Sequence, residues 1–338
     1  MQAIQRVKYS EDCAAALELR TVPKATLKDA EHVLVRVASV SINPVDVKLT
    51  AGWFAAVQRE QLPRTIGFDV AGVVVEVGAS VTELSVGDAV FGDVGVFCQE
   101  TFAEFVSAPA RKFARKPANI SFDEAASIPL AGLSALDALL WAQVAPGQTV
   151  VVRGASSGVG TLAVQIARIM GAARVIGISS REKLCKDLGC DEVVNYRTHK
   201  WEELLKGRNV DVFFDAIGGE NVFEFSKAVL KPSGAFVTVA GDRQSALSFG
   251  SVANLVAYVV SRKLMSWVSR APYFHYTMKA ETPAKMAQLA SWLADGQLRA
   301  VLDAGSPLPF TRDGALAAAQ KMNDGSAGGK VVLRVWSP

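Results

Sequence analysis

The chain has 338 residues, of which 50% are hydrophobic and 20% are charged, and its formal net charge is +3. This length predicts more than one hydrophobic core, and this composition excludes an intrinsically disordered chain. Because the small net charge provides no broad basic field, no nucleic-acid partner is expected.

The first 110 residues are predicted to be mainly β structure. Residues 32–42 and 70–77 are rich in β-branched side chains, and glycine–aspartate pairs such as Gly87-Asp88 separate the segments. The pattern changes near residue 121, where Ser121 and Glu124 have the spacing of a capping box that opens a short helix. A further helix is predicted at residues 133–143.

Strands and helices alternate in the next part of the chain. This alternation predicts βαβ units and a parallel sheet with helices on both faces. After residue 245 the pattern is weaker, although the tail is expected to return to the N-terminal β domain. The predicted strands are 149–153, 174–178, 192–195, 210–214, 235–239 and 330–336, and the predicted helices are 158–170, 181–188, 200–206, 221–230, 283–294 and 313–322.

The spacing of the cysteines and the lengths of the apolar segments indicate the cellular compartment in which the protein is expected. The four cysteines have no metal-ligand or disulfide-framework spacing, and Cys185 and Cys190 are interpreted as packing residues rather than as a redox pair. The N-terminal segment has no apolar signal core, and the longest dense apolar stretch, residues 252–260, is too short to span a bilayer. A cytoplasmic protein is expected, or a mature organellar form whose transit peptide has been removed.

Residues 251–270 combine apolar side chains with three basic ones, Arg262, Lys263 and Arg270. The segment is interpreted as a core-facing helix with a basic outer side or as the wall of a substrate pocket. A dimer contact and a membrane-surface helix are the alternatives. Membrane association is not expected.

A glycine-rich turn follows the strand predicted at residues 149–153. Gly154, Gly158 and Gly160 carry no side chain, so a pyrophosphate can approach the backbone there. The N-terminus of the following helix offers free N–H groups and a favourable dipole. Flanked by two strands and a helix, this motif predicts a dinucleotide site, and a plain tight turn is the alternative.

The end of the next strand discriminates between the two nicotinamide cofactors. In NAD-binding proteins an acidic residue about 20 residues past the glycines binds the ribose hydroxyls. Here the segment reads Ser179-Ser180-Arg181, and the first carboxylate is Glu182. Because serine and arginine can donate hydrogen bonds to a 2′-phosphate, NADPH is favoured over NADH. Alternatively, Arg181 is only a solvated residue at the start of a helix.

Together these motifs resemble the medium-chain dehydrogenase/reductase superfamily, and within it the zinc-less quinone oxidoreductase and alkenal/enone oxidoreductase branch. The resemblance implies an α/β protein with a GroES-like β domain (1–124 and 275–338) and a Rossmann domain with a doubly wound parallel sheet (125–274). It also implies a homodimer, often formed through the edges of the two Rossmann sheets. The matching blocks are residues 41–48, 67–74, 86–90, 125–135, 150–160, 214–218 and 328–332.

The resemblance implies roles for individual residues. Residues 156–160 would hold the pyrophosphate, Ser180, Arg181 and Tyr196 would surround the 2′-phosphate, and Lys330 would lie near polar groups of the cofactor. Residues 215–218 and Gly241 would line the nicotinamide ribose. The expected cofactor-binding residues are Ser134, Ala155, Ser156, Ser157, Gly158, Val159, Gly160, Ser179, Ser180, Arg181, Tyr196, Asp215, Ala216, Ile217, Gly218, Gly241 and Lys330, and the candidate catalytic residues are Asn43, Asp46, Phe54 and Ser134.

Some of these residues have a simpler interpretation. Asn43 and Asp46 would cap the turn after a strand, as the pattern Asn-Pro-x-Asp often does. Ser134, which the resemblance places near the nicotinamide with Asn43, would only satisfy the backbone of its own helix. The sequence leaves both interpretations open.

The departures from the superfamily pattern concern zinc. Zinc-dependent members carry a cysteine where this chain has Asn43, and a His-Glu pair where it has Phe68-Asp69. No catalytic zinc is therefore expected, which disfavours the oxidation of simple alcohols. A conjugated acceptor needs less stabilisation of negative charge by the protein, since hydride adds at its β-carbon and the charge spreads onto the oxygen.

A second departure concerns the related enoyl-thioester reductases, which carry a catalytic tyrosine in a Gly-x-Tyr segment. Here the segment reads Gly52-Trp53-Phe54, and Phe54 has no hydroxyl group that could donate a proton or a hydrogen bond. We expect an NADPH-dependent oxidoreductase that transfers a hydride to a small quinone or α,β-unsaturated carbonyl compound without a metal. The alternatives are an enoyl-thioester reductase and a non-enzymatic NADPH-binding module.

Overall fold

The computed structural model describes residues 1–53, 55, 60–95, 100–219, 221–240, 273–276 (backbone only) and 283–337. The chain forms two compact units, Met1–Leu130 with Glu281–Pro338 and Ala131–Ala280. Two of the predicted site residues, Phe54 and Gly241, and the segment 251–270 lie outside the described residues.

The first unit is built on β-sheets, as the N-terminal sequence predicts. Its larger sheet has the order β15-β16-β3-β5-β6-β8, with β7 on β3, and its smaller sheet has the order β2-β1-β4. The strands are β1 Gln2–Arg6, β2 Leu17–Thr21, β3 His32–Ser41, β4 Arg64–Thr65, β5 Asp69–Val77, β6 Ala89–Asp93, β7 Phe105–Pro109, β8 Phe113–Arg115, β15 Leu308–Pro309 and β16 Val332–Arg334.

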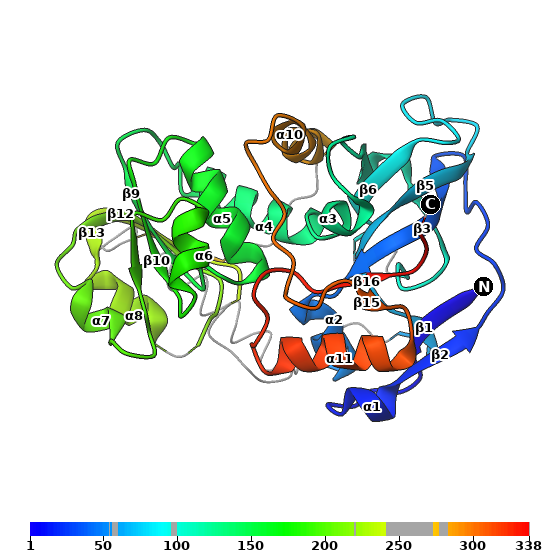
Figure 1. Cartoon of the computed structure of the whole chain (residues 1–338), viewed down its shortest axis with the longest axis horizontal. Coiled ribbons are helices and arrows are strands. Elements are labelled where there is room, and N and C mark those ends of the chain that lie inside the picture. Colours follow the sequence, from blue (N-terminus) through cyan, green and yellow to red (C-terminus); the bar gives the residue numbers. More distant parts are fainter. Residues whose placement is uncertain are drawn as a thin grey trace. The chain divides into compact units, whose positions relative to one another are not determined.

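The C-terminal tail belongs to this unit, which confirms its expected return to the β domain. Strand β16 pairs antiparallel with β3, so that Val332 lies opposite Ser41, and α11 lies beside α2 (Figure 1). The pairing places Lys330, just before β16, next to the residues that follow β3. The helices of this unit are α1 Cys13–Ala16, α2 Pro44–Thr50, a 3₁₀ turn Ala110–Lys112, α3 Phe122–Ala126, α10 Pro283–Ala294 and α11 Arg312–Asn323.

The helix expected after Ser121 is α3, and both halves of its capping box are present. Ser121 accepts the backbone N–H of Glu124, and the Glu124 carboxylate accepts the backbone N–H of Ser121. The next helix, α4 Pro129–Trp141, begins four residues before the predicted start at Leu133. Proline suits the first turn of a helix, because its fixed φ angle is helical and its missing N–H is not needed there.

The second unit contains one parallel sheet with the order β11-β10-β9-β12-β13-β14. Numbered from β9, this order is that of a doubly wound dinucleotide-binding fold, whose strand order reverses between β9 and β12. The α/β fold with a Rossmann sheet is thereby confirmed. The strands are β9 Thr149–Arg153, β10 Arg174–Ile178, β11 Glu192–Val194, β12 Val210–Asp215, β13 Leu230–Thr238 and β14 Tyr273–Tyr276.

The helices between these strands agree with the predicted ones except near β13. That strand begins at Leu230, opposite Val210, where the sequence pattern predicts the end of a helix. Pairing with β12 therefore outweighs the local helical pattern. The helices are α5 Gly158–Ile169, α6 Glu182–Asp187, α7 Trp201–Leu204 and α8 Val222–Lys227.

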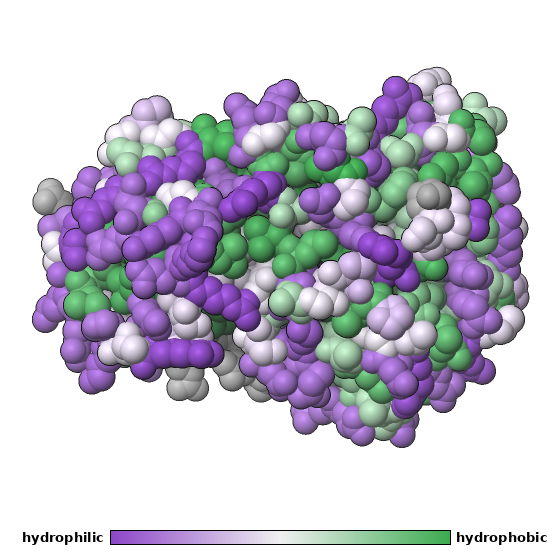
Figure 2. Space-filling model, viewed as in Figure 1, coloured by the Kyte–Doolittle hydropathy of each residue, from purple (hydrophilic) through white to green (hydrophobic). Residues whose placement is uncertain are grey.

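Aromatic side chains fill part of the core of this unit. The rings of Phe213 and Phe236 are stacked with centroids 5.8 Å apart, and Trp201 lies 5.3 Å from Phe213. Cys185 and Cys190 are buried free thiols, consistent with packing residues. Figure 2 shows hydrophilic side chains over much of the visible surface. None of the described helices is long and apolar enough to cross a membrane.

Candidate active site

The first candidate site lies at the carboxyl ends of β9 and β12, where the strand order of the second unit reverses. These strands are neighbours, with Arg153 opposite Asp215, so the loops that follow them lie together. A Cβ atom added to Gly154 would come within 2.6 Å of the Ile217 side chain, which shows how closely the two loops approach. Ligands of doubly wound sheets bind at this reversal point.

The glycine loop leads into α5 through a tight contact that excludes a side chain. A Cβ atom at Gly160 would lie 2.0 Å from the carbonyl oxygen of Gly154. The Ser157 hydroxyl caps the helix by accepting the N–H of Gly160 at 3.0 Å. Within the described part of the chain, the N–H groups of Gly158 and Val159 donate no hydrogen bond. They therefore remain available to an anion at the helix N-terminus.

The loop after β12 is organised by Asp215, a fully buried carboxylate. Its Oδ1 accepts hydrogen bonds from Arg153 Nη1 (2.8 Å) and from the N–H of Ile217 (3.2 Å). Its Oδ2 accepts from the N–H of Gly218 and from Thr238 Oγ1, both at 3.0 Å. With four donors on its two oxygens, the Asp215 side chain holds residues 216–218 in place. Ile217, 51% exposed, presents its side chain at the surface of this loop.

Hydrogen bonds join the glycine loop to the end of β10. Ser179 Oγ donates to Ser156 Oγ at 2.7 Å and accepts the N–H of Arg181 at 3.0 Å. Ser179 is almost completely buried, as is Ala155, so these two predicted residues support the loop from within. Ser156 and Ser180 are partly exposed, and the side chain of Arg181 is exposed.

Beyond Arg181 lies Tyr196, 54% exposed, whose hydroxyl is 3.5 Å from Ser180 Oγ. The hydrogen bond with Ser180, together with the nearby Arg197 and Arg181, lowers the pKa of the Tyr196 phenol. The hydrogen bond from Ser180 and the two guanidinium groups therefore favour the ionised phenol. Arg197 was not among the predicted residues, although its position directly after Tyr196 is a signal that the sequence contains.

These residues fit the groups of a phosphorylated dinucleotide. The loop offers free N–H groups and a helix dipole to a pyrophosphate. The end of β10 offers hydroxyl and guanidinium donors in place of an acid. The first carboxylate after it, Glu182, is exposed and pairs with Lys186 at 2.7 Å. These donors suit a 2′-phosphate better than free ribose hydroxyls.

The second candidate site, in the first unit, begins at Asn43, which ends the chain segment between β3 and α2. Its backbone N–H donates to Asp46 Oδ2 at 2.8 Å, which caps the helix as the sequence suggests. Asn43 Nδ2 donates to Asp69 Oδ2 at 2.8 Å, and Asn43 Oδ1 accepts from Lys330 Nζ at 2.7 Å. The capping interpretation therefore holds for Asp46, whose carboxylate completes the capping box with Asn43, while the Asn43 side chain is also held by Asp69 and Lys330.

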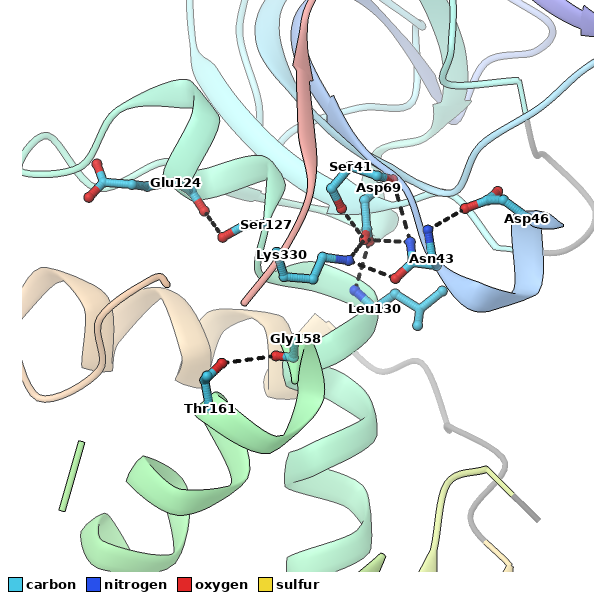
Figure 3. A network of polar contacts seen from close by, with 10 residues as sticks. All are labelled: Ser41, Asn43, Asp46, Asp69, Glu124, Ser127, Leu130, Gly158, Thr161 and Lys330. Carbon is cyan, nitrogen blue, oxygen red and sulfur yellow. Dashed lines mark hydrogen bonds and ion pairs between the residues drawn. The ribbon is translucent and has the colours of Figure 1, made fainter. Parts of the chain in front are cut away.

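Asp69 is the centre of this second site, and sequence reasoning missed it as a site residue. Its carboxylate is fully buried and also accepts from Lys330 Nζ (3.0 Å), Ser41 Oγ (2.7 Å) and the N–H of Leu130 (2.8 Å) (Figure 3). The signal was present, since Asp69 stands in the block 67–74 where zinc-dependent members have His-Glu. Lys330, a predicted cofactor residue, is only 6% exposed.

Asp46 has a different environment from Asp69. Burial, together with the charge of Asp69, raises the pKa of the Asp46 carboxyl to about 7, against the hydrogen bond from Asn43 and the charge of Lys330. Its second oxygen, Oδ1, is buried without a hydrogen-bond partner. A neutral carboxylic acid is favoured there, because an unpaired buried charge is costly.

The remaining predicted residue, Ser134, is partly exposed within α4. Among the described residues, no group of three or more His, Cys, Asp or Glu side chains lies close enough together to hold a metal ion. At the zinc positions of the superfamily this chain offers an amide (Asn43), a phenyl ring (Phe68) and a carboxylate (Asp69) that pairs with an ammonium group. This set of side chains does not fit a catalytic zinc site.

Comparison with known families agrees with both units. The family described as "Alcohol dehydrogenase GroES-like domain" matches residues 29–118, and "Zinc-binding dehydrogenase" matches residues 188–333. A 2-methylene-furan-3-one reductase from Solanum lycopersicum is 31% identical over 313 residues, which cover 90% of this chain and 71% of the relative. The chain belongs to the medium-chain dehydrogenase/reductase superfamily. Within this superfamily it belongs to the zinc-less quinone and alkenal oxidoreductase branch.

Two further members of this branch show its range. An NADPH-dependent alkenal/one oxidoreductase of the chloroplast from Arabidopsis thaliana is 30% identical, over 90% of this chain and 72% of the relative. The solved structure of the quinone oxidoreductase from Coxiella burnetii is 28% identical, covers 99% of both chains and has a TM-score of 0.82. The resemblance predicted from the sequence is thereby confirmed.

Proposed function

We propose that this chain is an NADPH-dependent reductase that transfers a hydride to a small quinone or α,β-unsaturated carbonyl compound without a metal ion. The observation that carries the cofactor assignment is the end of β10, where Ser179, Ser180 and Arg181 replace the acid of NAD-binding proteins. Ser179 ties this segment to the glycine loop, so the donors for the 2′-phosphate and for the pyrophosphate belong to one connected structure.

The predicted residues of the second unit fall into three groups. Gly158 and Val159 offer N–H groups to the pyrophosphate, and Ser180, Arg181 and Tyr196 surround the 2′-phosphate, with Arg197 as a further cation. Asp215 holds Ala216, Ile217 and Gly218 along the nicotinamide side through the hydrogen bonds described above. These groups act by binding and orientation, which supply a large part of the rate in such a reaction.

When bound, NADPH supplies a hydride. The chain contributes the network of Asn43, Asp69 and Lys330, in which both polar ends of the amide and the ammonium group are fixed by hydrogen bonds. In a conjugated acceptor the negative charge spreads onto the oxygen as an enolate, whose α-carbon takes its proton from water. The acceptor thus provides part of the stabilisation that zinc provides in other members of the superfamily.

The experiment that tests this function is a steady-state screen with NADPH and, in parallel, with NADH. Substrates are quinones, short alkenals, enones, enoyl thioesters and unconjugated aldehydes. We expect turnover of quinones or enones with NADPH and much weaker activity with NADH. Turnover restricted to enoyl thioesters would favour the enoyl-thioester reductase, and tight NADPH binding without turnover of any acceptor would favour a binding module.

We further propose a homodimer formed through the edges of two Rossmann sheets. Strand β14 stands at the end of the strand order and pairs, among the described strands, only with β13. A free strand edge of this kind can pair with the same edge of a second copy. Analytical ultracentrifugation tests the proposal, and a monomer at micromolar concentration would contradict it.

A cytoplasmic location is proposed as well, although some relatives are chloroplastic or mitochondrial. Imaging of the tagged protein in cells tests this location.

A further inference from the structure

The buried carboxylate of Asp69 connects four segments that are far apart in the sequence. Its donors come from the end of β3 (Ser41), from the residue before α2 (Asn43), from the first turn of α4 (Leu130) and from the segment before β16 (Lys330). Figure 3 shows Ser41, Asn43 and Lys330 converging on this one carboxylate.

We propose that Asp69 is a positioning residue, whose negative charge holds the Lys330 ammonium and the Asn43 amide in the orientation that serves NADPH and its acceptor. This inference rests on the proposed function. Asp69 itself need not touch either ligand, because four protein donors already occupy its two oxygens.

The orientation of the Asn43 amide follows from the chemistry of its two neighbours. A carboxylate only accepts hydrogen bonds and an ammonium only donates them. Asn43 therefore directs its NH₂ group to Asp69, at 2.8 Å, and its oxygen to Lys330, at 2.7 Å. If the amide were flipped, its oxygen would face the Asp69 carboxylate, which is also an acceptor, and its NH₂ group would face the Lys330 ammonium, which is also a donor. The charge of Asp69, together with that of Lys330, thus selects one orientation.

Lys330 depends on Asp69 in a second way. Its ammonium group is almost fully buried, and Asp69 is its only ion-pair partner among the described residues, at 3.0 Å. Removing one member of such a pair leaves an uncompensated charge, which is costly. In the described part of the chain Lys330 Nζ donates to two oxygens, those of Asn43 and Asp69. Because an ammonium group has three N–H donors, one remains for an oxygen of a ligand.

The test compares two substitutions at Asp69, one that removes the charge of the side chain and one that changes its size. Asp69→Asn keeps the size of the side chain but removes its charge, whereas Asp69→Glu keeps the charge but adds a methylene group to a packed interior. Both changes lower stability, the first by leaving the Lys330 ammonium without its ion-pair partner and the second by overpacking, so a purely structural role predicts that NADPH affinity follows the melting temperature in the two variants. A positioning role predicts that Asp69→Glu retains more NADPH affinity than Asp69→Asn, even where its melting temperature is lower.

The matched control is Asp123→Asn. Asp123 is also a buried carboxylate of the first unit, but it accepts from Ser39 Oγ at 2.5 Å and pairs with Arg334, away from the Asp69 network. We expect Asp123→Asn to lower the melting temperature and to leave the NADPH dissociation constant within about twofold. Loss of NADPH affinity in this control comparable to that in Asp69→Asn would overturn the inference.

A double-mutant cycle with Lys330→Met completes the test, with NADPH binding followed by fluorescence and with kcat and KM measured on an enone. We expect Asp69→Asn and Lys330→Met each to weaken NADPH by at least about tenfold, and the double variant to be no weaker than the worse single one. The inference would be overturned if the factors by which the two single substitutions weaken NADPH multiplied in the double variant. It would also be overturned if Asp69→Asn bound NADPH with the affinity of the unaltered protein. If the unaltered protein neither bound NADPH nor reduced any acceptor, the proposed function itself would fail instead.

Discussion

The hydroxyl of Ser179 donates a hydrogen bond of 2.7 Å to the hydroxyl of Ser156. This contact joins the end of β10 to the glycine loop, 23 residues earlier in the chain. Since Ser179 also accepts the N–H of Arg181, its hydroxyl holds together the two segments that we propose to bind the phosphates. We therefore expect the cofactor preference of the chain to depend on both loops.

The first prediction concerns Arg181. Arg181→Ala should weaken NADPH by about tenfold or more, because the loss of one charge-assisted contact costs on the order of 1.5–3 kcal/mol. NADH, which lacks the 2′-phosphate, should be nearly unaffected. Lys183→Ala is the matched control, since Lys183 is an exposed cation two residues away that pairs with Asp187. Equal losses for the two cofactors would remove Arg181 from the 2′-phosphate site.

The second prediction concerns the close approach at Gly160. In Gly160→Ala the new methyl group would lie 2.0 Å from the carbonyl oxygen of Gly154, so the loop must shift. Unlike Arg181→Ala, this variant should weaken NADPH and NADH together, because the pyrophosphate is common to both. Dissociation constants from fluorescence titration check this, and a loss confined to NADPH would be inconsistent with a pyrophosphate role for the loop.

The third prediction concerns the position of hydride addition. With deuterium at the transferred position of NADPH, an enone product should carry the label on its β-carbon, and the α-carbon should take its proton from solvent. Mass spectrometry and NMR of the product locate the label. Label on the carbonyl carbon, giving an allylic alcohol, would mean direct carbonyl reduction and would refute the mechanism.

The fourth prediction concerns metal and unconjugated substrates. Activity on quinones or enones should survive treatment with a chelator, because the side chains at the zinc positions of the superfamily are Asn43, Phe68 and Asp69. Simple aldehydes should react about 100–1000-fold more slowly, since no metal ion stabilises the alkoxide. Elemental analysis that found one zinc per chain, lost together with activity, would contradict this.

The fifth prediction concerns Asp46 and pH. Its pKa rises from 3.8 to about 7 in the folded protein, so between these values the folded state holds a proton that the unfolded state has lost. The contribution of Asp46 to stability is therefore present at low pH and is lost as the pH rises through about 7. Asp46→Asn mimics the protonated acid and should remove this dependence.

Urea unfolding of both proteins at pH 5 and pH 8 provides the measurement. Relative to the unaltered chain, Asp46→Asn should be more stable at pH 8 than at pH 5. The comparison between the two proteins cancels the contributions of other titrating groups. An equal stability difference at the two pH values would show that Asp46 is ionised in the folded protein at both.

The sequence alone predicts those structural features that depend on residues close together along the chain. Strands β9 and β10 have the predicted bounds, and the capping box of Ser121 and Glu124 forms, because capping and strand patterning involve residues only a few positions apart. The glycine loop and Ser180-Arg181 could be assigned for the same reason, since one βαβ unit brings them together. The superfamily could be assigned because its blocks occur in order along the chain.

Only the tertiary structure decided how distant residues meet. Lys330 lies 287 positions from Asn43 and 261 from Asp69, and the pairing of β16 with β3 brings them together. The local pattern at Asn43 suggested a helix cap, and the fold in addition places its side chain between a buried carboxylate and a buried ammonium group. The hydrogen-bond donors of Asp69 and those of Asp215 could not be foreseen for the same physical reason. A buried carboxylate must find its donors wherever the fold brings them, and their places in the sequence do not reveal them.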